Sequence, residues 1–185
     1  MERKTALIAV ADGVEEVEAI GVADVLIRAG VEVTLAASQE LIITGSRHIQ
    51  FIANRLISEC VNHQYDLIVV PGGMPGAEHL RDTPELISLL KAQKASGKLF
   101  AAICASPVVV LQHHGLLAGL NATCHPSLVD ELTIRDFAEN SVVVDKNCVT
   151  SQGPGTALEF AIKLVELLFN RDKADIIAKA MVIPH

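Results

Sequence analysis

The stretch KLFAAICASPVVVLQHHG, from Lys98 to Gly115, decides the fold of this chain. It opens with a mostly apolar segment that has the length of a buried strand, and SPVVVLQHHG then has the pattern of a helix that ends at Gly115. Cys104 stands where the strand passes into the helix. Two interpretations of this thiol are open: a small apolar residue of the core, or a nucleophile held on a sharp turn.

Strands and helices are predicted to alternate along the rest of the chain. Apolar runs indicate strands at residues 5–11, 32–37, 66–73, 98–103, 141–145 and 148–151, and a short hairpin from 41–45 and 48–53. Helical patterns cover residues 15–30, 84–95, 106–115, 156–170 and roughly 173–181, with Gly30 as a stop and Thr156 as a cap. This alternation predicts an α/β fold with a mostly parallel sheet and helices on both faces.

Three turns of the predicted sheet are expected to meet at one edge. In sheets of this kind, ligands bind beyond the carboxyl ends of the strands. The turns that follow those ends are ADGVEEVE (residues 11–18), PGGMPG (71–76) and ICASP (103–107). We therefore expect the functional site to be built from these turns.

Length, composition and charge limit the class of protein. The chain has 185 residues, which predicts a single domain over residues 1–185. Half of the residues are hydrophobic, but no run approaches 18 apolar residues, so no membrane helix is expected. The net charge of −7 argues against non-specific binding to nucleic acid or anionic membranes. Because the N-terminal residues lack the pattern of a secretory signal, a cytoplasmic location is expected.

The other cysteines suggest neither a disulfide framework nor a metal site. Cys60, Cys124 and Cys148 are widely spaced and form no CxxC pair, so we expect buried, reduced thiols. Cys124 lies beside His125, but adjacent residues of a strand point to opposite faces, which leaves zinc weakly supported. No metal is predicted.

The position of Cys104 permits nucleophilic chemistry. Amide groups at the start of a helix favour a thiolate and lower the pKa of a cysteine. The same amides can stabilise an oxyanion, with the amide of Ala105 as one donor. A second donor is expected from the Pro71-Gly72-Gly73 turn, where missing side chains allow close approach.

One of three nearby acids, and one histidine, are candidates to act on that thiol. Glu15 and Glu16 have the character of ordinary first-turn acids, whereas Glu18 has apolar neighbours on both sides. If Glu18 points at Cys104, its charged form raises the thiol pKa and its protonated form donates a hydrogen bond, so we expect it to be neutral near pH 7. His125 is either a base for Cys104 or an ordinary loop histidine before proline.

Five motifs in order resemble the ThiJ/PfpI superfamily, and most of all its bacterial ThiJ branch and the parkinsonism-associated deglycases. The likeness runs from Thr5 to about Val182 and is carried by ADGVEEVEAIGVADVLIRAG, YDLIVVPGGMPGAEHLRD, LFAAICASPVVVL, ATCHPSL and TSQGPGTALEFAIKLVELL. The resemblance implies a flavodoxin-like three-layer sandwich that works as a homodimer without a cofactor.

The resemblance also implies roles for single residues. Cys104 would be the nucleophile and Glu18 its protonated partner, with amides from Gly73 and Ala105 and with His125 nearby. Two arginines would bind substrate or small anions: Arg28, reaching the partner subunit's site, and Arg47. The spacing of these two arginines alone indicates nothing beyond surface charges.

Two functions follow from the resemblance, and the residues exclude others. One is an enzyme acting on α-oxoaldehydes or their protein adducts, as a glyoxalase or deglycase. The other is a redox-responsive chaperone whose Cys104 is oxidised to a sulfinate, and a pure interaction protein is a third interpretation. Ala105 stands where protease-like members carry histidine, and no acid is placed to complete a triad with His125, which argues against a peptidase or an amidotransferase. No phosphate-binding glycine loop supports thiamine-precursor synthesis.

Overall fold

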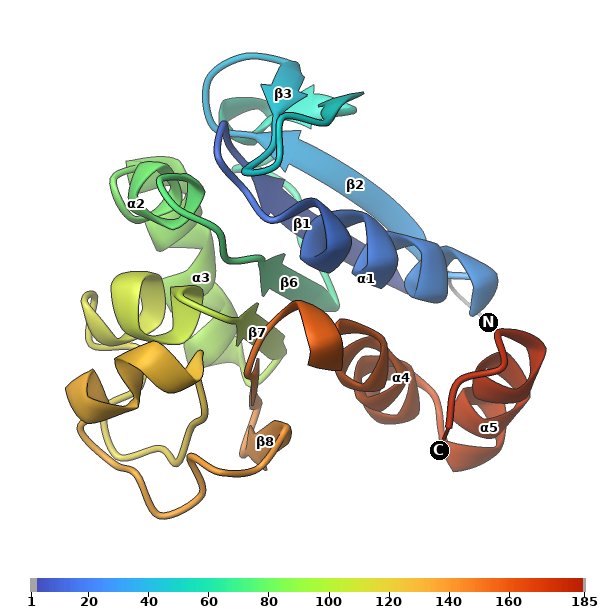
Figure 1. The fold of residues 1–185 in the computed structure, drawn as a ribbon. Helices are drawn as coiled ribbons and strands as arrows, with labels where there is room; N and C mark the ends of the chain where they lie inside the picture. The colour runs from blue at the N-terminus through green and yellow to red at the C-terminus, as the bar shows by residue number, and fades with distance from the viewer. Residues whose placement is uncertain (1–2, 185) are drawn as a thin grey trace.

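A seven-stranded sheet in the order β5-β2-β1-β6-β7-β9-β8 forms the centre of the computed structural model, which describes residues 3–184 (Figure 1). Neighbouring strands are parallel except β8 and β9, which are antiparallel. A separate antiparallel hairpin pairs β3 (Ile42–Thr44) with β4 (Gln50–Ile52). The strands of the main sheet are β1 (Thr5–Val10), β2 (Glu32–Ala37), β5 (Arg55–Leu56), β6 (Leu67–Val70), β7 (Leu99–Ile103), β8 (Val142–Asp145) and β9 (Cys148–Ser151).

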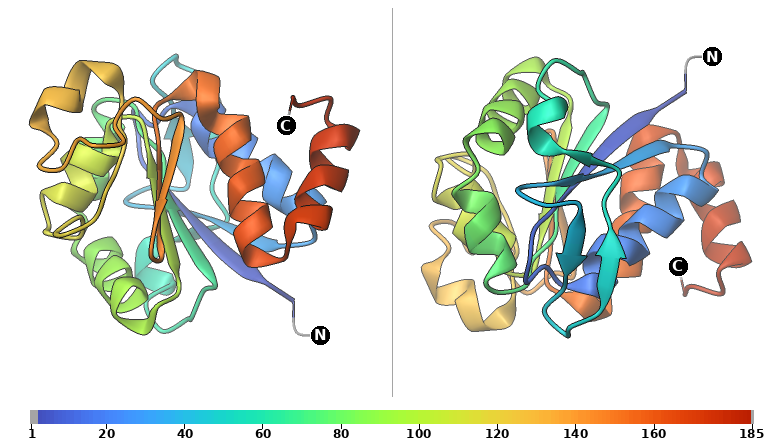
Figure 2. Two further views of the ribbon diagram at one scale, coloured as in Figure 1. Left: turned by 90° about the horizontal axis from the view of Figure 1, so that it is seen from below. Right: turned by 90° about the horizontal axis from the view of Figure 1, so that it is seen from above.

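Helices cover both faces of this sheet, so the protein is a three-layer sandwich of the flavodoxin-like type (Figure 2). One face carries α1 (Glu16–Arg28), α4 (Ala157–Leu168) and α5 (Arg171–Ala180). The other carries α2 (Gly76–Arg81), α3 (Pro84–Ser96) and a π-helical segment, Pro107–Gln112. Short 3₁₀ turns lie at Ile57–Glu59, Pro126–Glu131 and Pro154–Thr156.

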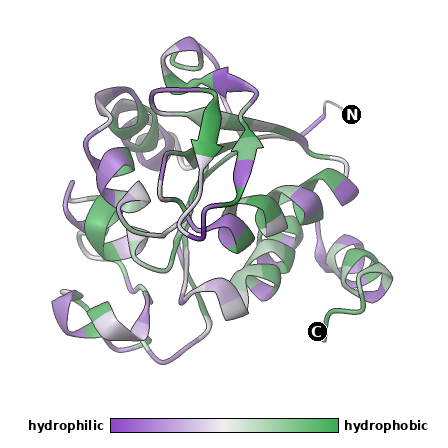
Figure 3. Cartoon of the chain, turned by 45° about the horizontal axis from the view of Figure 1, so that its top comes forward, coloured by the Kyte–Doolittle hydropathy of each residue, from purple (hydrophilic) through white to green (hydrophobic). Residues whose placement is uncertain are grey.

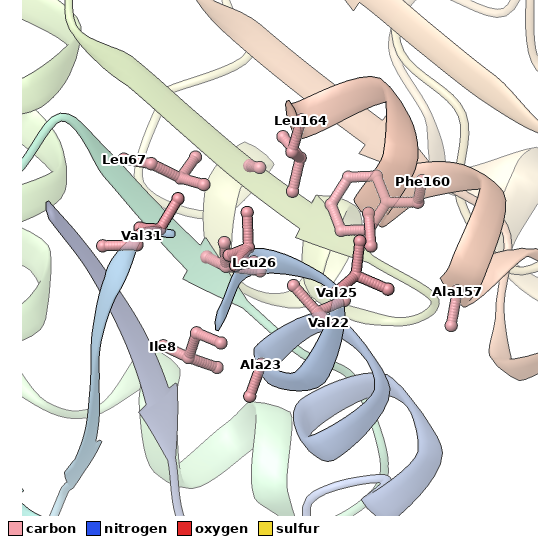
Figure 4. Packing of buried hydrophobic residues seen from close by; sticks show 14 of the residues in the cluster. Ile8, Val22, Ala23, Val25, Leu26, Val31, Leu67, Ala157, Phe160 and Leu164 are labelled. Carbon is pink, nitrogen blue, oxygen red and sulfur yellow. The ribbon is translucent and has the colours of Figure 1, made fainter. Parts of the chain in front are cut away.

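The central strands are apolar on both sides because each side faces a helical layer. Along β1, Ile8 packs into the core beneath α1 and α4, whereas Leu7 packs into the core beneath α2 and α3. On the first side, Val22 and Leu26 of α1 approach Phe160 of α4 (Figure 4). α4 and α5 themselves carry both hydrophobic and hydrophilic residues around each turn, as expected for helices with one buried face (Figure 3).

Most predicted elements are confirmed, with differences at their ends. The predicted helix 173–181 begins earlier, at Arg171, because the side chain of Asn170 accepts a 2.9 Å hydrogen bond from the amide of Lys173 and so caps it. Thr156 does occupy the N-cap position of α4, but the expectation that its side chain caps the helix is wrong. Its hydroxyl instead hydrogen bonds with Ser151 and with the backbone of Gly153.

Two elements of the sheet's carboxyl edge differ from the prediction. The segment after Cys104 is helical as expected, but its central part is a π-helix, with the amide of His113 donating to the carbonyl of Val108. Helix α2 is absent from the predicted elements, because six residues are too few to show a helical period. Both elements follow directly on turns that build the site described next.

Candidate active site

Cys104 lies on a strained turn between β7 and the π-helical segment. Its φ angle is +65°, a left-handed conformation that costs a residue with a side chain about 1–3 kcal/mol. Two hydrogen bonds hold the turn: the amide of Cys104 donates to the carbonyl of Ser151 (3.0 Å), and its carbonyl accepts from the amide of His125 (2.8 Å). The sharp turn that the sequence suggested is therefore present, and the thiol is half-buried on it.

The glycine turn after β6 lies directly against Cys104. A Cβ atom added to Gly72 would stand 2.6 Å from the Cβ of Cys104 and 3.0 Å from Oε2 of Glu18. The carbonyl of Gly72 also accepts a 2.9 Å hydrogen bond from the amide of Glu15. The three turns predicted to meet at one edge of the sheet do meet, and only a glycine fits between them at this point.

Glu18 is fully buried beneath this turn. Its Oε2 accepts a 2.7 Å hydrogen bond from the amide of Gly72, whereas Oε1 is buried without a regular partner among the described residues. Burial raises the pKa of Glu18 to about 7, against the opposing effects of the Gly72 amide and the Cys104 thiol. A carboxyl group with this pKa can both take and release a proton near neutrality.

The thiol of Cys104 faces that carboxyl and two backbone amides. Burial and the charge of Glu18 raise the pKa of Cys104 to about 12, while the amides of Gly73 and Ala105 lower it. The expectation that the helix-start amides would leave this pKa below its ordinary value is therefore wrong when Glu18 is ionised. With these pKa values the pair holds two protons below about pH 7 and one proton above it. The thiolate exists in the one-proton form, when the remaining proton lies on Glu18.

Ser106 connects the turn at Cys104 to the glycine turn after β6. Its side chain is fully buried, and its hydroxyl donates a 2.5 Å hydrogen bond to the carbonyl of Pro71. Pro71 opens the turn whose next residues are Gly72 and Gly73. The bond therefore links the segment that carries the sulfur to the turn that carries the amide of Gly73.

A pocket of about 420 Å³ opens above the sulfur of Cys104. Gly73 and Ala105, whose amides act on the sulfur, lie in its wall. Glu15, Arg47 and His125 also line it, so the pocket presents an acid, a cation and an imidazole to any occupant. Its volume is several times that of a three-carbon aldehyde.

Glu16 holds the loop that brings Arg47 to this pocket. Its Oε1 accepts hydrogen bonds from the amides of Arg47 (2.8 Å) and Ile49 (3.2 Å). Burial raises the pKa of Glu16, but these and other hydrogen bonds outweigh it, so the pKa is lowered overall. Ser46 in the same loop donates to Oε2 of Glu15 (2.9 Å). Neither acid is therefore simply a solvated first-turn residue, and both are buried.

His125 lies at the start of the 3₁₀ turn Pro126–Glu131, beside the pocket. Its Nδ1 contacts the hydroxyl of Ser127 at 2.8 Å and the amide of Ser127 at 3.2 Å. Within residues 3–184 the ring therefore hydrogen bonds with the hydroxyl and the amide of Ser127 and not with a carboxylate, and no Cys-His-acid triad forms there.

Arg28 lies away from the pocket of its own chain. It sits at the end of α1, where its Nε bonds both carboxylate oxygens of Asp24 at 3.0 and 3.1 Å. It does not contribute to the lining that Arg47 and His125 share. Cys60, Cys124 and Cys148 are buried, as the sequence suggested.

Residues 3–184 hold no group of three metal-ligating side chains. None of the helices in this range has both the length and the apolar character that a membrane crossing requires.

Sequence reasoning missed several residues of the pocket. Ser46 and Ser127 belong to loops, and nothing in their spacing points to Cys104. In the sequence, Glu15 has the position of an ordinary acid at the start of a helix. Its contact partner Ser46 is 31 residues away. Such long-range contacts leave no periodic signal in a single sequence.

A strained cysteine between strand and helix, with amides converging on its sulfur, defines a class: α/β proteins with a cysteine nucleophile elbow. Comparison with known proteins identifies the family. The family model described as the DJ-1/PfpI family matches residues 4–167. The chain belongs to the DJ-1/PfpI family, which confirms the resemblance seen in its motifs.

Individual relatives extend this likeness over nearly the whole chain. "Toxoplasma gondii DJ-1, oxidized" is a solved structure with 45% sequence identity and a TM-score of 0.96, covering 98% of this chain and 100% of that one. "Glutathione-independent glyoxalase DJR-1.2" of Caenorhabditis elegans is 36% identical over 184 residues, 98% of this chain and 97% of the relative. "Protein DJ-1 homolog B" of Arabidopsis thaliana is 43% identical over 96% of this chain, which spans only 41% of that relative's length.

Proposed function

We propose that this protein is a cysteine-dependent enzyme that converts α-oxoaldehydes such as methylglyoxal, or their early protein adducts, without a cofactor. The observation that carries the proposal is the placement of the half-buried Cys104 against the fully buried Glu18, whose pKa is raised to about 7. The name of the Caenorhabditis elegans relative, a glutathione-independent glyoxalase, supports the same class of reaction.

The first step is addition of the thiolate to the aldehyde. The proton of Cys104 moves to Glu18, and the sulfur forms a bond to the aldehyde carbon while the carbonyl electron pair moves to oxygen. The amides of Gly73 and Ala105 stabilise that oxyanion, which then takes the proton back and becomes a hemithioacetal.

The second step moves a proton between the two carbons. Glu18 removes the proton from the carbon bound to sulfur, giving an enediol, and a proton is returned to the neighbouring carbon. The product is a thioester of lactate on Cys104. Water cleaves it, releasing lactate and restoring the thiol, so methylglyoxal plus water gives lactic acid with no change in overall redox state.

A second candidate function is a redox-responsive protein. Of the four cysteines, Cys104 is half-buried while the other three are buried, so an oxidant reaches it first. Two molecules of hydrogen peroxide convert its thiolate into a sulfinate with release of two molecules of water. A protonated Glu18 then donates a hydrogen bond to the new oxygens. The Toxoplasma gondii relative, whose solved structure is that of an oxidized protein, supports this candidate.

A cytoplasmic homodimer is part of the proposal. Exposed apolar residues gather on α1 and the β3–β4 hairpin, including Ile27 (58% exposed), Ile49 (59%) and Ile52 (69%), and a second copy would cover them. In such a dimer Arg28 would reach the site of the partner subunit, and Arg47 would bind carboxylates or other small anions from its own side of the pocket.

Lactate release from methylglyoxal, in buffer free of added thiols, tests the enzymatic function. Wild type should form lactate and Cys104→Ser should not, because a hydroxyl at this position ionises far less readily than a thiol. Cys60→Ala is the matched control, since this buried cysteine lies outside the pocket, and it should retain activity.

The result also separates the two candidates. Absence of lactate from wild type would overturn the enzymatic function. Mass spectrometry of the peroxide-treated protein then decides the second candidate, which requires the addition of two oxygens to Cys104 before any other cysteine.

A further inference from the structure

The imidazole of His125 is held by two donors on the same atom. The backbone amide of Ser127 donates to Nδ1 at 3.2 Å, and the hydroxyl of Ser127 lies 2.8 Å from it. A hydroxyl can reverse its role, but a backbone N–H can only donate. Both contacts are satisfied together only when Nδ1 carries a lone pair, so the proton of the neutral ring lies on Nε2.

The other ring nitrogen is free to meet an occupant of the pocket. Nε2 makes no hydrogen bond with the described residues. It is also not buried, because Glu18 Oε1 is the one buried side-chain polar atom without a partner in this range. The ring edge carrying Cδ2 lies beside Gly153, where an added Cβ would come within 3.5 Å of that atom. His125 shares the wall of the 420 Å³ pocket with Cys104 and Ala105. The ring thus carries a single N–H donor in the wall of this pocket.

We propose that Ser127 fixes His125 as the Nε2–H tautomer, so that His125 serves the reaction as a neutral hydrogen-bond donor to the substrate's carbonyl oxygen and not as the base that deprotonates Cys104. This inference rests on the proposed function for the identity of that oxygen, but not for the tautomer.

The assignment follows from where a proton could go. A base accepts a proton on a lone pair, and the lone pair of this ring is on Nδ1, where Ser127 occupies it with two donors. Protonation of Nδ1 would make its N–H group face the backbone N–H of Ser127, and two donors repel each other. The proton of the thiol therefore goes to Glu18, while His125 adds a third donor to the amides of Gly73 and Ala105. Ser127 is a positioning residue in this scheme.

Nitrogen-15 NMR tests the tautomer directly. Long-range proton–nitrogen correlation spectra distinguish the two nitrogens of a neutral ring, and they should be recorded at about pH 8.5, well above the usual histidine pKa of about 6.5. The chain has seven histidines, and the signals lost in His125→Gln identify the ring in question. The expected result is an unprotonated Nδ1 and a protonated Nε2, and the opposite pattern overturns the proposal.

A matched pair of variants tests the role of Ser127. Ser127→Ala keeps the backbone donor and should keep the tautomer, whereas Ser127→Pro removes that donor and should produce a mixture. Circular dichroism establishes that both are folded. If neither substitution changes the tautomer of a folded protein, Ser127 does not set it. The wild-type spectrum remains decisive where Ser127→Pro fails to fold.

Kinetics test whether the ring donates or accepts. A glutamine can present an N–H group at a similar reach but cannot act as a base, so His125→Gln should lose much less lactate-forming activity than His125→Ala. Loss of one such donor costs about 100-fold. Equal losses in the two variants would overturn the donor role. If wild type forms no lactate, the proposed function fails, yet the spectra still confirm or overturn the tautomer.

Discussion

The hydroxyl of Ser106 donates a 2.5 Å hydrogen bond to the carbonyl of Pro71, across the interior between the nucleophile elbow and the glycine turn. The two amide donors and the thiol lie next to this contact in the sequence, since Gly73 follows Pro71 and Ala105 precedes Ser106. It links two segments that are 35 residues apart in the sequence.

Removal of this hydroxyl should weaken both stability and reactivity. Ser106→Ala leaves the buried carbonyl of Pro71 without a partner, which costs about 1–3 kcal/mol of unfolding free energy. Alkylation of Cys104 by iodoacetamide should also slow, because the amide of Gly73 is no longer held against the sulfur. Urea unfolding and mass spectrometry measure the two effects. The exposed Ser58→Ala is the control, and equal behaviour of the two variants would show that the contact contributes nothing.

The pKa of Cys104 should fall when Glu18 loses its charge. With Glu18 ionised, burial and this charge raise the pKa of the thiol to about 12. Glu18→Gln removes the charge and leaves a neutral N–H donor beside the sulfur, so the thiol pKa should decrease. Ultraviolet absorbance of the thiolate against pH measures it, with Cys104→Ser supplying the background. An identical titration in wild type and Glu18→Gln would refute the coupling.

Glu18 should also make stability depend on pH. Burial raises its folded pKa to about 7 from a reference value of 4.5, so the folded state binds the proton more tightly than the unfolded state. This contribution is fully present below pH 4.5 and is lost as the pH rises through 7. It amounts to roughly 3 kcal/mol.

Comparison of two proteins isolates this contribution. Wild-type unfolding free energy, relative to that of Glu18→Gln, should decrease between about pH 4.5 and pH 7 and then level off. Glu16 and Asp66, whose pKa values are lowered, work in the opposite direction at acidic pH and cancel in the comparison. A constant difference across this range would mean that Glu18 titrates normally.

The space between Cys104 and Glu18 admits no side chain at position 72. In Gly72→Ala, the new methyl group would stand 2.6 Å from the Cβ of Cys104, so the elbow or the glycine turn must move. We expect a loss of about 1–3 kcal/mol in stability. Lactate-forming activity should fall at the same time. Gly155→Ala is the control, because an added Cβ meets nothing within 4 Å there. Full activity of Gly72→Ala would contradict the close packing.

Self-association should depend on the exposed face of α1. Ile27→Glu places a charge among the apolar residues that the proposed dimer buries, and light scattering should show a monomer where wild type is dimeric. Val144→Glu, on the edge strand β8, introduces the same charge away from α1 and should remain dimeric. A monomeric wild type, or an Ile27→Glu variant that remains dimeric, would show that the exposed face of α1 is not a dimer interface.

The fold and the position of the site were predictable because they depend on local patterns. Apolar runs that lead into the Gly72-Gly73 turn and into Cys104 mark strand ends, and the ends of parallel strands share one edge. The net direction of the Cys104 pKa was not predictable, since it depends on how deeply the thiol itself is buried and on its contact with Glu18. The same holds for Ser127, whose effect on His125 comes from the geometry of a single turn.

Position 104 carries its cysteine in a backbone conformation with φ of +65°, which glycine would adopt without strain. A redesign guided by stability alone would therefore choose glycine at this position and remove the proposed nucleophile. At such a site, a substitution that increases stability is expected to decrease activity. Stabilising libraries built on this scaffold should hold residue 104 fixed and seek their gains elsewhere in the chain.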